Sequence, residues 1–144
     1  MKGWLLDTNV LSELRRGKPV PSVVEFVASK PIEALFVSEV SLAEIRFGIE
    51  RAKEPGLRAE LKIWLDRKVR PMFERRTLPV SEDVMFQWRL LVEEGRRMRH
   101  TLSQPDLIVA ATALHYDLTL VTRDTADFEK TRVALTDPWR LPQT

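Results

Sequence analysis

Residues 3–14 read GWLLDTNVLSEL, a stretch in which an apolar run ends abruptly in Asp7. The run Gly3–Leu6 predicts a short buried strand, and the apolar spacing over Thr8–Arg15 predicts a helix, which a following glycine and proline would end. A buried strand that leads straight into a helix is typical of α/β folds. The stretch therefore predicts one strand and one helix with an acidic residue at their junction.

The same alternation of strands and helices recurs along the rest of the chain. Apolar residues spaced by three and four predict helices, short apolar runs predict strands, and parallel strands need crossovers that are usually helical. We therefore expect an α/β fold, a three-layer α/β/α sandwich with a central parallel β-sheet. The expected helices after the first lie near 23–27 and at 40–53, 57–69, 84–95 and 107–114, and the expected strands at 35–37, 78–80, 118–121 and, on an edge, 133–135.

Composition bounds the class of protein. The chain has 144 residues, of which 44% are hydrophobic and 31% charged, so we expect a single domain over residues 1–144. No apolar run approaches the roughly 18 residues that a transmembrane helix needs, and no signal-like segment begins the chain, which favours a cytoplasmic protein without membrane contact. The absence of cysteine excludes disulfides, thiolate metal sites and a cysteine nucleophile.

Net charge alone does not indicate a nucleic-acid binder, since the formal value is only +2. Two local clusters of basic residues are nevertheless present. Either cluster could be a solvated helix end, because basic residues are favourable in the last turn of a helix. The clusters are Arg15, Arg16 and Lys18, and Arg96, Arg97, Arg99 and His100.

Acidic residues follow two of the expected strands at the point where each strand ends. Asp7 follows the first strand, and Asp124 and Asp127, in LTLVTRDTADFEK, follow the strand at 118–121. Open parallel sheets bind ligands beyond the carboxyl ends of their strands. If the two strands are parallel, these carboxylates lie on one rim of the sheet.

Two further acids lie on expected helices. Glu44, in SEVSLAEIRFGIE, is expected on the largely apolar, inward face of its helix, beside the space that Gly48 leaves open. Asp106, in SQPDLIVAATA, lies in the first turn of the most apolar helix, where a charge that points inward would need a partner. That partner could be Arg123, less readily His115, or a bound cation.

Each acid taken singly has a simpler explanation as a helix cap. Asp7 could cap the helix that follows it, and Asp124 could cap a turn that contains Asp127. Two serine and acid pairs also match the capping-box pattern, in which the serine hydroxyl accepts the backbone N–H of the acid and the acid accepts the backbone N–H of the serine. These pairs are Ser103 with Asp106 and Ser41 with Glu44.

Taken as a set, the acids indicate a metal site. Converging carboxylates repel one another unless a cation lies between them, and an all-oxygen set suits Mg²⁺ or Mn²⁺. Such a site is suited to metal-assisted attack of water on a phosphodiester. Zinc is disfavoured, since the chain has no cysteine and only two histidines. Thr8, Asn9 and Thr122 border the acids and could orient them or hold metal-bound water, or simply make turn and cap hydrogen bonds.

Four motifs occur in order over nearly the whole chain, LLDTNVLSEL, SLAEIRFG, QPDLIVAATAL and LTLVTRDTADF. In this order and spacing the sequence resembles a PIN-domain ribonuclease of the VapC type, the toxin of a type II VapBC toxin–antitoxin system. The resemblance implies a parallel sheet flanked by helices, an endoribonuclease site that depends on Mg²⁺ or Mn²⁺, and frequent homodimers. It also implies a VapB-like antitoxin whose C-terminal segment occupies the active-site groove, with operator DNA bound only through the antitoxin.

The resemblance also assigns roles to residues. Asp7, Glu44 and Asp106 match the family's acidic triad. The fourth acid is Asp124, with Asp127 as a second candidate, because many relatives have asparagine after the Thr-Arg pair and an acid three residues later. The candidate metal ligands are thus Asp7, Asp106, Asp124 and Asp127, and the candidate RNA-backbone contacts are Arg15, Arg96, Arg97 and Arg99.

Two other functions fit parts of the pattern. A module that binds antitoxin and operator DNA, with weak or no hydrolysis, would keep the same fold, although the presence of all the expected acids argues against it. A metal-dependent phosphatase on a related scaffold would prefer an acid two residues after the first one, and Asn9 occupies that position.

Overall fold

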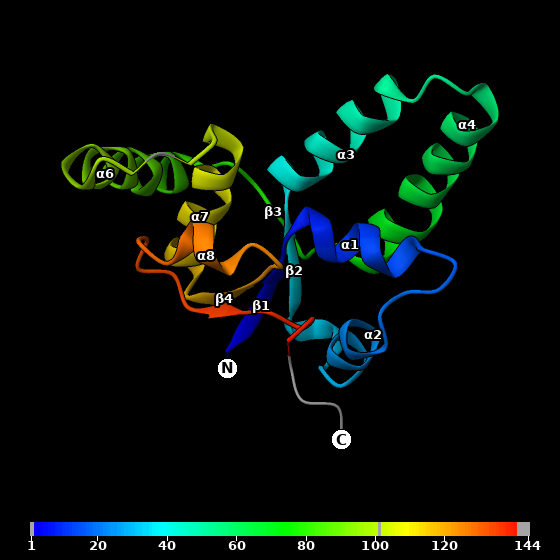
Figure 1. Ribbon diagram of the computed structural model, residues 1–144, viewed down its shortest axis with the longest axis horizontal. Helices are drawn as coiled ribbons and strands as arrows, with labels where there is room; N and C mark the ends of the chain where they lie inside the picture. Colours follow the sequence, from blue (N-terminus) through cyan, green and yellow to red (C-terminus); the bar gives the residue numbers. More distant parts are fainter. Residues whose placement is uncertain (1, 101, 141–144) are drawn as a thin grey trace.

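The computed structural model describes residues 2–100 and 102–140, and a five-stranded sheet lies at its centre (Figure 1). The strands are β1 (Gly3–Leu6), β2 (Leu35–Ser38), β3 (Thr77–Leu78), β4 (Leu118–Val121) and β5 (Leu135–Thr136). They lie in the order β3-β2-β1-β4-β5, and every neighbouring pair is parallel. The strand that opens the chain is therefore the middle strand of the sheet.

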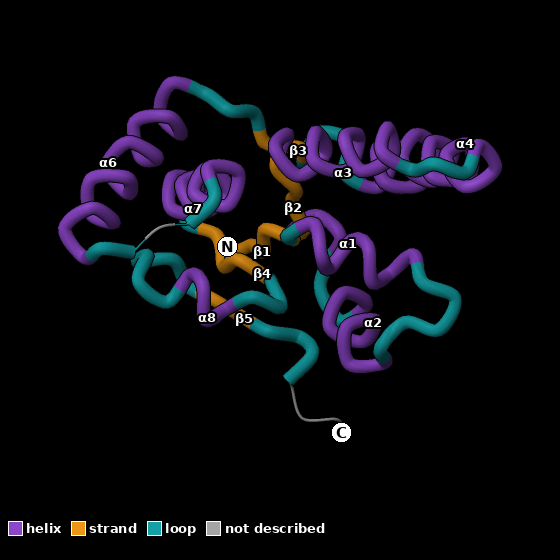
Figure 2. Tube along the Cα trace, turned by 45° about the horizontal axis from the view of Figure 1, so that its top comes forward, coloured by secondary structure: helices purple, strands orange, loops and turns teal. Residues whose placement is uncertain are grey.

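Helices cover both faces of this sheet, which confirms the expected three-layer arrangement (Figure 2). They are α1 (Thr8–Arg15), α2 (Pro21–Ala28), η1 (Ile32–Ala34), α3 (Glu39–Arg51), α4 (Pro55–Trp64), η2 (Leu65–Val69), α5 (Arg70–Met72), α6 (Glu82–Met98), α7 (Gln104–Tyr116) and α8 (Thr125–Phe128). α1, α2 and α3 pack with Leu6 in one apolar cluster, and α6, α7 and α8 pack with Leu5 in the other. Alternate strand residues point to opposite faces, so these two neighbours, both fully buried, serve separate cores. Among the described helices, none is both long and apolar enough to cross a membrane.

β1, α1 and β4 begin and end where the sequence predicts, but the helix expected over residues 57–69 does not stay regular. α4 ends at Trp64, and the next turn, η2, is a π-helix in which the Arg70 N–H donates to the Leu65 carbonyl. Pro71 accounts for the change, because proline has no N–H and its ring conflicts with the carbonyl four residues earlier in an α-helix.

Both edge strands differ in position from the sequence prediction. β3 covers Thr77–Leu78 rather than 78–80, because Pro79 cannot donate a hydrogen bond to a neighbouring strand. β5 covers Leu135–Thr136 rather than 133–135, and it pairs with the last two residues of β4. The expected edge position of this last strand is confirmed.

The carboxyl ends of β1 and β4 meet at one rim of the sheet. The two strands pair in register along their whole length, from Gly3 with Leu118 to Leu6 with Val121. One residue beyond β1, the Asp7 N–H still donates to the Val121 carbonyl at 3.0 Å. The fold thus brings together the polar residues that follow each strand.

Candidate active site

Asp7 lies at the junction of β1 and α1 and is buried, with 7% of its surface exposed. One carboxylate oxygen accepts the Thr8 backbone N–H at 2.8 Å, which confirms Asp7 as the N-cap of α1. The other oxygen accepts the Thr122 hydroxyl at 2.9 Å. Burial raises the pKa of Asp7 in spite of both hydrogen bonds, and the charges of Asp106 and Asp124 raise it further. The cap is therefore also a fixed, buried carboxylate whose charge is poorly compensated.

Thr122 is the centre of a hydrogen-bond network that joins the ends of β1 and β4. Besides donating to Asp7, its fully buried hydroxyl accepts the Asn9 side-chain N–H at 3.2 Å. The same hydroxyl accepts the Asp124 backbone N–H at 3.1 Å. Asn9 extends the network, because its amide donates to the Asp124 carboxylate at 3.2 Å and accepts the Arg123 N–H at 3.3 Å. Asn9 and Thr122 therefore hold the two carboxylates in a fixed relation.

Asp106 approaches this network from the first turn of α7. The N-cap of α7 is Ser103, whose hydroxyl accepts the Asp106 backbone N–H at 3.3 Å, so the serine half of the expected capping box forms. The Asp106 side chain is half-buried. Burial raises its pKa, and the charges of Asp124 and Asp127 add to that effect. Repulsion among these carboxylates shows that they share one electrostatic environment.

Asp124 is exposed and occupies the N-cap position of α8. Its side chain accepts no backbone N–H there, so the simpler capping explanation fails for its carboxylate. The turn that includes Asp127 forms instead through the backbone, with the Asp127 N–H donating to the Asp124 carbonyl at 3.0 Å. The Asp124 carboxylate is therefore held by Asn9 rather than used as a helix cap.

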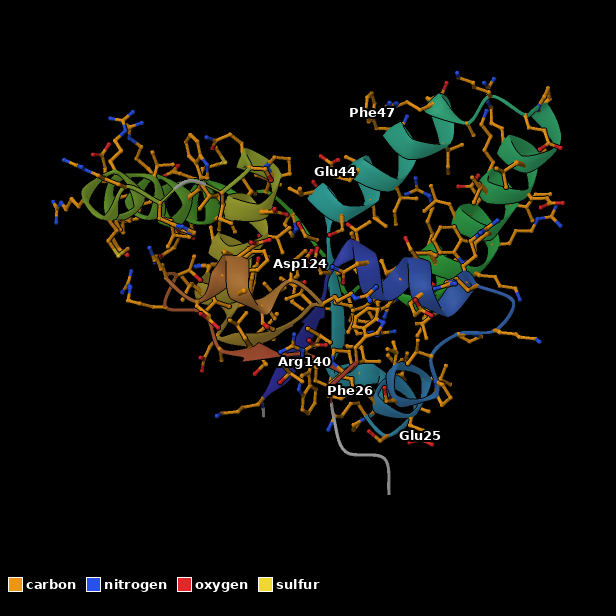
Figure 3. The ribbon with its side chains drawn as sticks, viewed as in Figure 1. Glu25, Phe26, Glu44, Phe47, Asp124 and Arg140 are labelled. Atoms are coloured by element: carbon orange, nitrogen blue, oxygen red, sulfur yellow. The ribbon has the colours of Figure 1, made fainter. Side chains whose placement is uncertain are left out.

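Glu44 is exposed, and its expected place on the inward face of its helix is wrong. The buried face of α3 is formed by Ser41, Leu42, Ile45 and Ile49, whereas Glu44 and Phe47 project from another side of α3 (Figure 3). The expected capping box of Ser41 with Glu44 is also wrong, because the N-cap is Ser38, whose hydroxyl accepts the Val40 N–H at 3.0 Å. Glu44 nevertheless borders the same groove as the aspartates.

An open groove with a volume of about 790 Å³ runs over the rim of the sheet. It brings together most of the predicted site, namely the four acids proposed as catalytic, their neighbours Thr8 and Asn9, and Arg15. Arg16 and Arg123 give it further positive charge beside the carboxylates. The lining residues are Asp7, Thr8, Asn9, Ser12, Glu13, Arg15, Arg16, Glu44, Ser103, Pro105, Asp106, Arg123, Asp124 and Trp139.

Other predicted residues lie outside the lining of this groove. Asp127 is exposed on α8, where its backbone carbonyl lies 3.1 Å from the His100 ring. Arg96 and Arg97 lie in the last turn of α6, and Arg99 follows it in a left-handed conformation with φ 52°. Arg96 borders a separate, smaller hollow between α6 and α7. The structure thus places Arg96, Arg97 and Arg99 outside the groove that Asp7, Asp106 and Asp124 line.

The sequence did not indicate Glu13 or Trp139 as site residues, and it indicated Arg123 only as a possible charge partner of Asp106. Glu13 is 4% exposed, and its carboxylate accepts the Val20 N–H at 2.9 Å and an Arg16 N–H at 3.3 Å. The hydrogen bond from the Val20 N–H is the main cause that lowers the pKa of Glu13, and the hydrogen bond from Arg16 lowers it further. The Arg123 guanidinium lies over the Trp139 ring, 5.4 Å from its centroid. Trp139 follows the last strand in a segment without periodicity, so the sequence gives no signal for this contact.

The donor set suits a hard divalent cation. In the part of the chain that the structure describes, no three acidic or histidine side chains form a ready-made metal cluster. Mg²⁺, however, keeps several waters and takes only one or two protein carboxylates. Asp7, Asp106 and Asp124 could supply carboxylate oxygens to such a cation, which would relieve the repulsion among their charges. Asp7 and Asp106 are therefore the residues best placed to hold such an ion, with Asp124 beside them.

Comparison with known proteins agrees with this arrangement. The PIN domain family matches residues 4–134. The chain is 30% identical over 135 residues to the VapC ribonuclease Y4jK of Sinorhizobium fredii, a match that covers 94% of this chain and 96% of that protein. It is 33% identical over 135 residues to toxin FitB of Neisseria gonorrhoeae, covering 94% of this chain and 97% of FitB.

A solved structure supports the same relationship. In the structure of FitAB bound to an IR36 DNA fragment, one chain is 31% identical to this protein and superposes with a TM-score of 0.89. The superposition covers 97% of this chain and 98% of that one. Sequence match, fold and the acidic rim of the sheet agree, and the chain belongs to the PIN domain family.

Proposed function

We propose that this protein is the toxin of a VapBC type II toxin–antitoxin system, an endoribonuclease that hydrolyses RNA phosphodiester bonds with Mg²⁺ or Mn²⁺. The observation that carries the proposal is Asp7, a buried carboxylate at the rim of a parallel sheet whose pKa is raised by burial and by neighbouring acids. A carboxylate in this position is stabilised by a cation. The relatives named a VapC ribonuclease and a toxin support the reaction and the role.

Each acid has a proposed part. Asp7, Asp106 and Asp124 hold the cation, with Asp127 as the alternative to Asp124, and Glu44 at the groove edge accepts a proton from the attacking water. When bound, the divalent ion supplies activation of water and neutralises charge on the phosphate. Thr122 keeps Asp7 oriented, Asn9 keeps Asp124 oriented, and Thr8 fixes the second Asp7 oxygen.

The groove also has the charge pattern that an RNA strand requires. A phosphate at the carboxylates is repelled unless a cation is present, whereas Arg15 and Arg16 on the neighbouring wall attract it directly. Arg96, Arg97 and Arg99 lie outside the groove and remain predicted contacts for RNA that extends beyond it. Backbone contacts of this kind give affinity that falls with salt and carry no sequence information.

Partners follow from the same proposal. We propose a VapB-like antitoxin that blocks the groove, and operator DNA bound only through it, which the DNA-bound FitAB structure supports. We also propose a homodimer, since large apolar side chains remain exposed in the monomer, with Phe47 at 59% and Phe86 at 63%. The whole chain, residues 1–144, would act as one PIN domain in the cytoplasm, where its RNA substrates are.

Cleavage of RNA by the antitoxin-free protein tests the proposal. We expect cleavage with Mn²⁺, none with EDTA, and loss of both cleavage and calorimetric Mn²⁺ binding in Asp7→Asn, while circular dichroism stays unchanged. Asp117→Asn is the matched control, because it makes the same chemical change at an exposed helix end with φ 54°, which asparagine tolerates.

Two kinds of result would contradict the proposed nuclease function. Full activity in Asp7→Asn, or in EDTA, would end the proposal. A protein that bound no divalent ion and cleaved no RNA would instead be the antitoxin- and operator-associated module without hydrolysis.

A further inference from the structure

Arg123 is held in the groove by an aromatic ring. It comes directly after Thr122 at the end of β4, and its guanidinium lies 5.4 Å from the centroid of the Trp139 ring, within the range of a cation–π contact. Both residues line the groove that contains Asp7 and Asp124. The side chain therefore has a preferred position before any ligand arrives.

No carboxylate of the described residues forms an ion pair with Arg123. Among the described residues, no side-chain hydrogen bond or ion pair involves its guanidinium, and its only hydrogen bond runs from the backbone N–H to Asn9. Arg16 differs, because Glu13 accepts its guanidinium N–H at 3.3 Å. Arg123 does lower the pKa of Glu13, but as the smallest of the causes. Its N–H donors thus remain available to a ligand while the guanidinium stays beside the Trp139 ring.

The ring that supports Arg123 is itself well fixed. Trp139 packs against the apolar cluster that contains α1, α2 and α3. Its backbone N–H donates to the Asp137 carboxylate at 2.9 Å, which closes the turn after β5. Because the side chain packs against this cluster and the backbone is fixed by the turn, the ring can orient the guanidinium beside it.

Building on the function proposed above, we propose that Arg123, seated on Trp139, binds a phosphate of the RNA strand next to the phosphodiester that is cleaved. A guanidinium presents its N–H donors as a planar fork, which matches two phosphate oxygens, and the Trp139 ring keeps the Arg123 guanidinium in the groove. Trp139 is then a positioning residue that acts through Arg123. The contact is to the backbone, so it strengthens binding of any single-stranded sequence.

RNA affinity measured without cleavage tests this role. The probe is a fluorescein-labelled 20-nucleotide oligouridylate, titrated by anisotropy in EDTA over several salt concentrations, with every variant in the Asp7→Asn background. Arg123→Met should weaken binding roughly ten-fold, the size expected for a charged hydrogen bond, and lower the salt slope by about 0.7 for one single-strand phosphate. Arg123→Lys should restore the slope but only part of the affinity.

Two further variants test whether Trp139 acts by positioning Arg123 and whether the effect is specific to an arginine in the groove. Trp139→Leu keeps the charge, so affinity should fall by about three-fold while the salt slope stays that of the parent. Arg67→Met removes another exposed arginine, which lies on η2 outside the groove, and should change neither the affinity nor the salt slope. Circular dichroism of each variant checks folding.

Failure of this inference can be told apart from failure of the proposed function. Unchanged affinity and slope in Arg123→Met, beside cleavage that Asp7→Asn abolishes, would overturn the anchor and leave the nuclease intact. Weaker binding in Arg123→Met, beside a wild type that never cleaves, would keep the anchor and end the nuclease proposal. Absence of oligouridylate binding in the parent would overturn the anchor.

Discussion

Replacing Thr122 by valine removes the central hydroxyl of the network with little change in side-chain size. The hydroxyl is fully buried, donates to Asp7 at 2.9 Å and accepts two N–H groups at 3.1 and 3.2 Å. A hydrogen bond to a charged group contributes roughly 1.5–3 kcal/mol, and a neutral one about 1 kcal/mol. The two neutral donors lie where water can reach them in part, so we expect Thr122→Val to lower the free energy of unfolding by about 3 kcal/mol at pH 7.

Urea unfolding in EDTA, followed by far-UV circular dichroism, measures this loss. With a slope of about 2 kcal/mol per M for a small protein, the midpoint should fall by about 1.5 M. Thr122→Ser is the control, because it keeps the hydroxyl and loses one buried methyl group, which costs about 1 kcal/mol. The difference in free energy of unfolding between the valine and serine variants should become smaller as the pH is lowered. A protonated, neutral Asp7 loses less than a charged one when the Thr122 hydroxyl is absent. A valine variant as stable as the serine variant at pH 7 would refute the role of the hydroxyl.

The remaining predictions concern three substitutions that change the stability of the fold. Burial raises the pKa of Asp7 above its ordinary 3.8, so the folded state binds more protons than the unfolded state, and the free energy of unfolding falls as pH rises through the raised pKa. In EDTA at pH 7, Asp7→Asn should therefore need more urea to unfold than the wild type, and at pH 3 it should not; a more stable wild type at pH 7 would contradict this. Gly48→Ala should stabilise by up to about 1 kcal/mol, because a Cβ there meets no atom within 4 Å. Gly95→Ala should destabilise, because its Cβ would lie 2.7 Å from a backbone carbonyl oxygen; thermal unfolding of both variants checks the opposite signs.

Strand and helix positions at the centre of the fold could be predicted because each depends on local pattern. β1 and β4 are short apolar runs, buried on both faces as parallel strands are, and Asp7 marks the end of the first one. The parallel arrangement then follows from the helical crossovers, and it places Asp7 near Asp124. Local sequence pattern and sheet topology together are therefore sufficient to predict where the aspartates at the rim of the sheet lie.

The orientation of Glu44 could not be obtained in this way. α3 extends past the sheet (Figure 1), so only one narrow face of this helix is covered, and Phe47 stays 59% exposed. An apolar neighbour therefore does not mark the inward face. The contact between Arg123 and Trp139 could not be predicted from the sequence for a different reason. It joins two segments that have no helical or strand periodicity and that meet only through tertiary packing.

The bond between Thr122 and Asp7 spans 115 positions of the chain, which has a consequence for synthesis. A ribosome releases β1 and Asp7 first, but the middle strand of the sheet must wait for β4 before it gains its second neighbour. Until the segment that carries Thr122 and Asp124 has emerged, Asp7 lacks both the hydroxyl that donates to it and the carboxylate of Asp124. A nascent chain, or one truncated before β4, therefore cannot assemble the site, so any toxicity would begin only once translation of this protein is nearly complete.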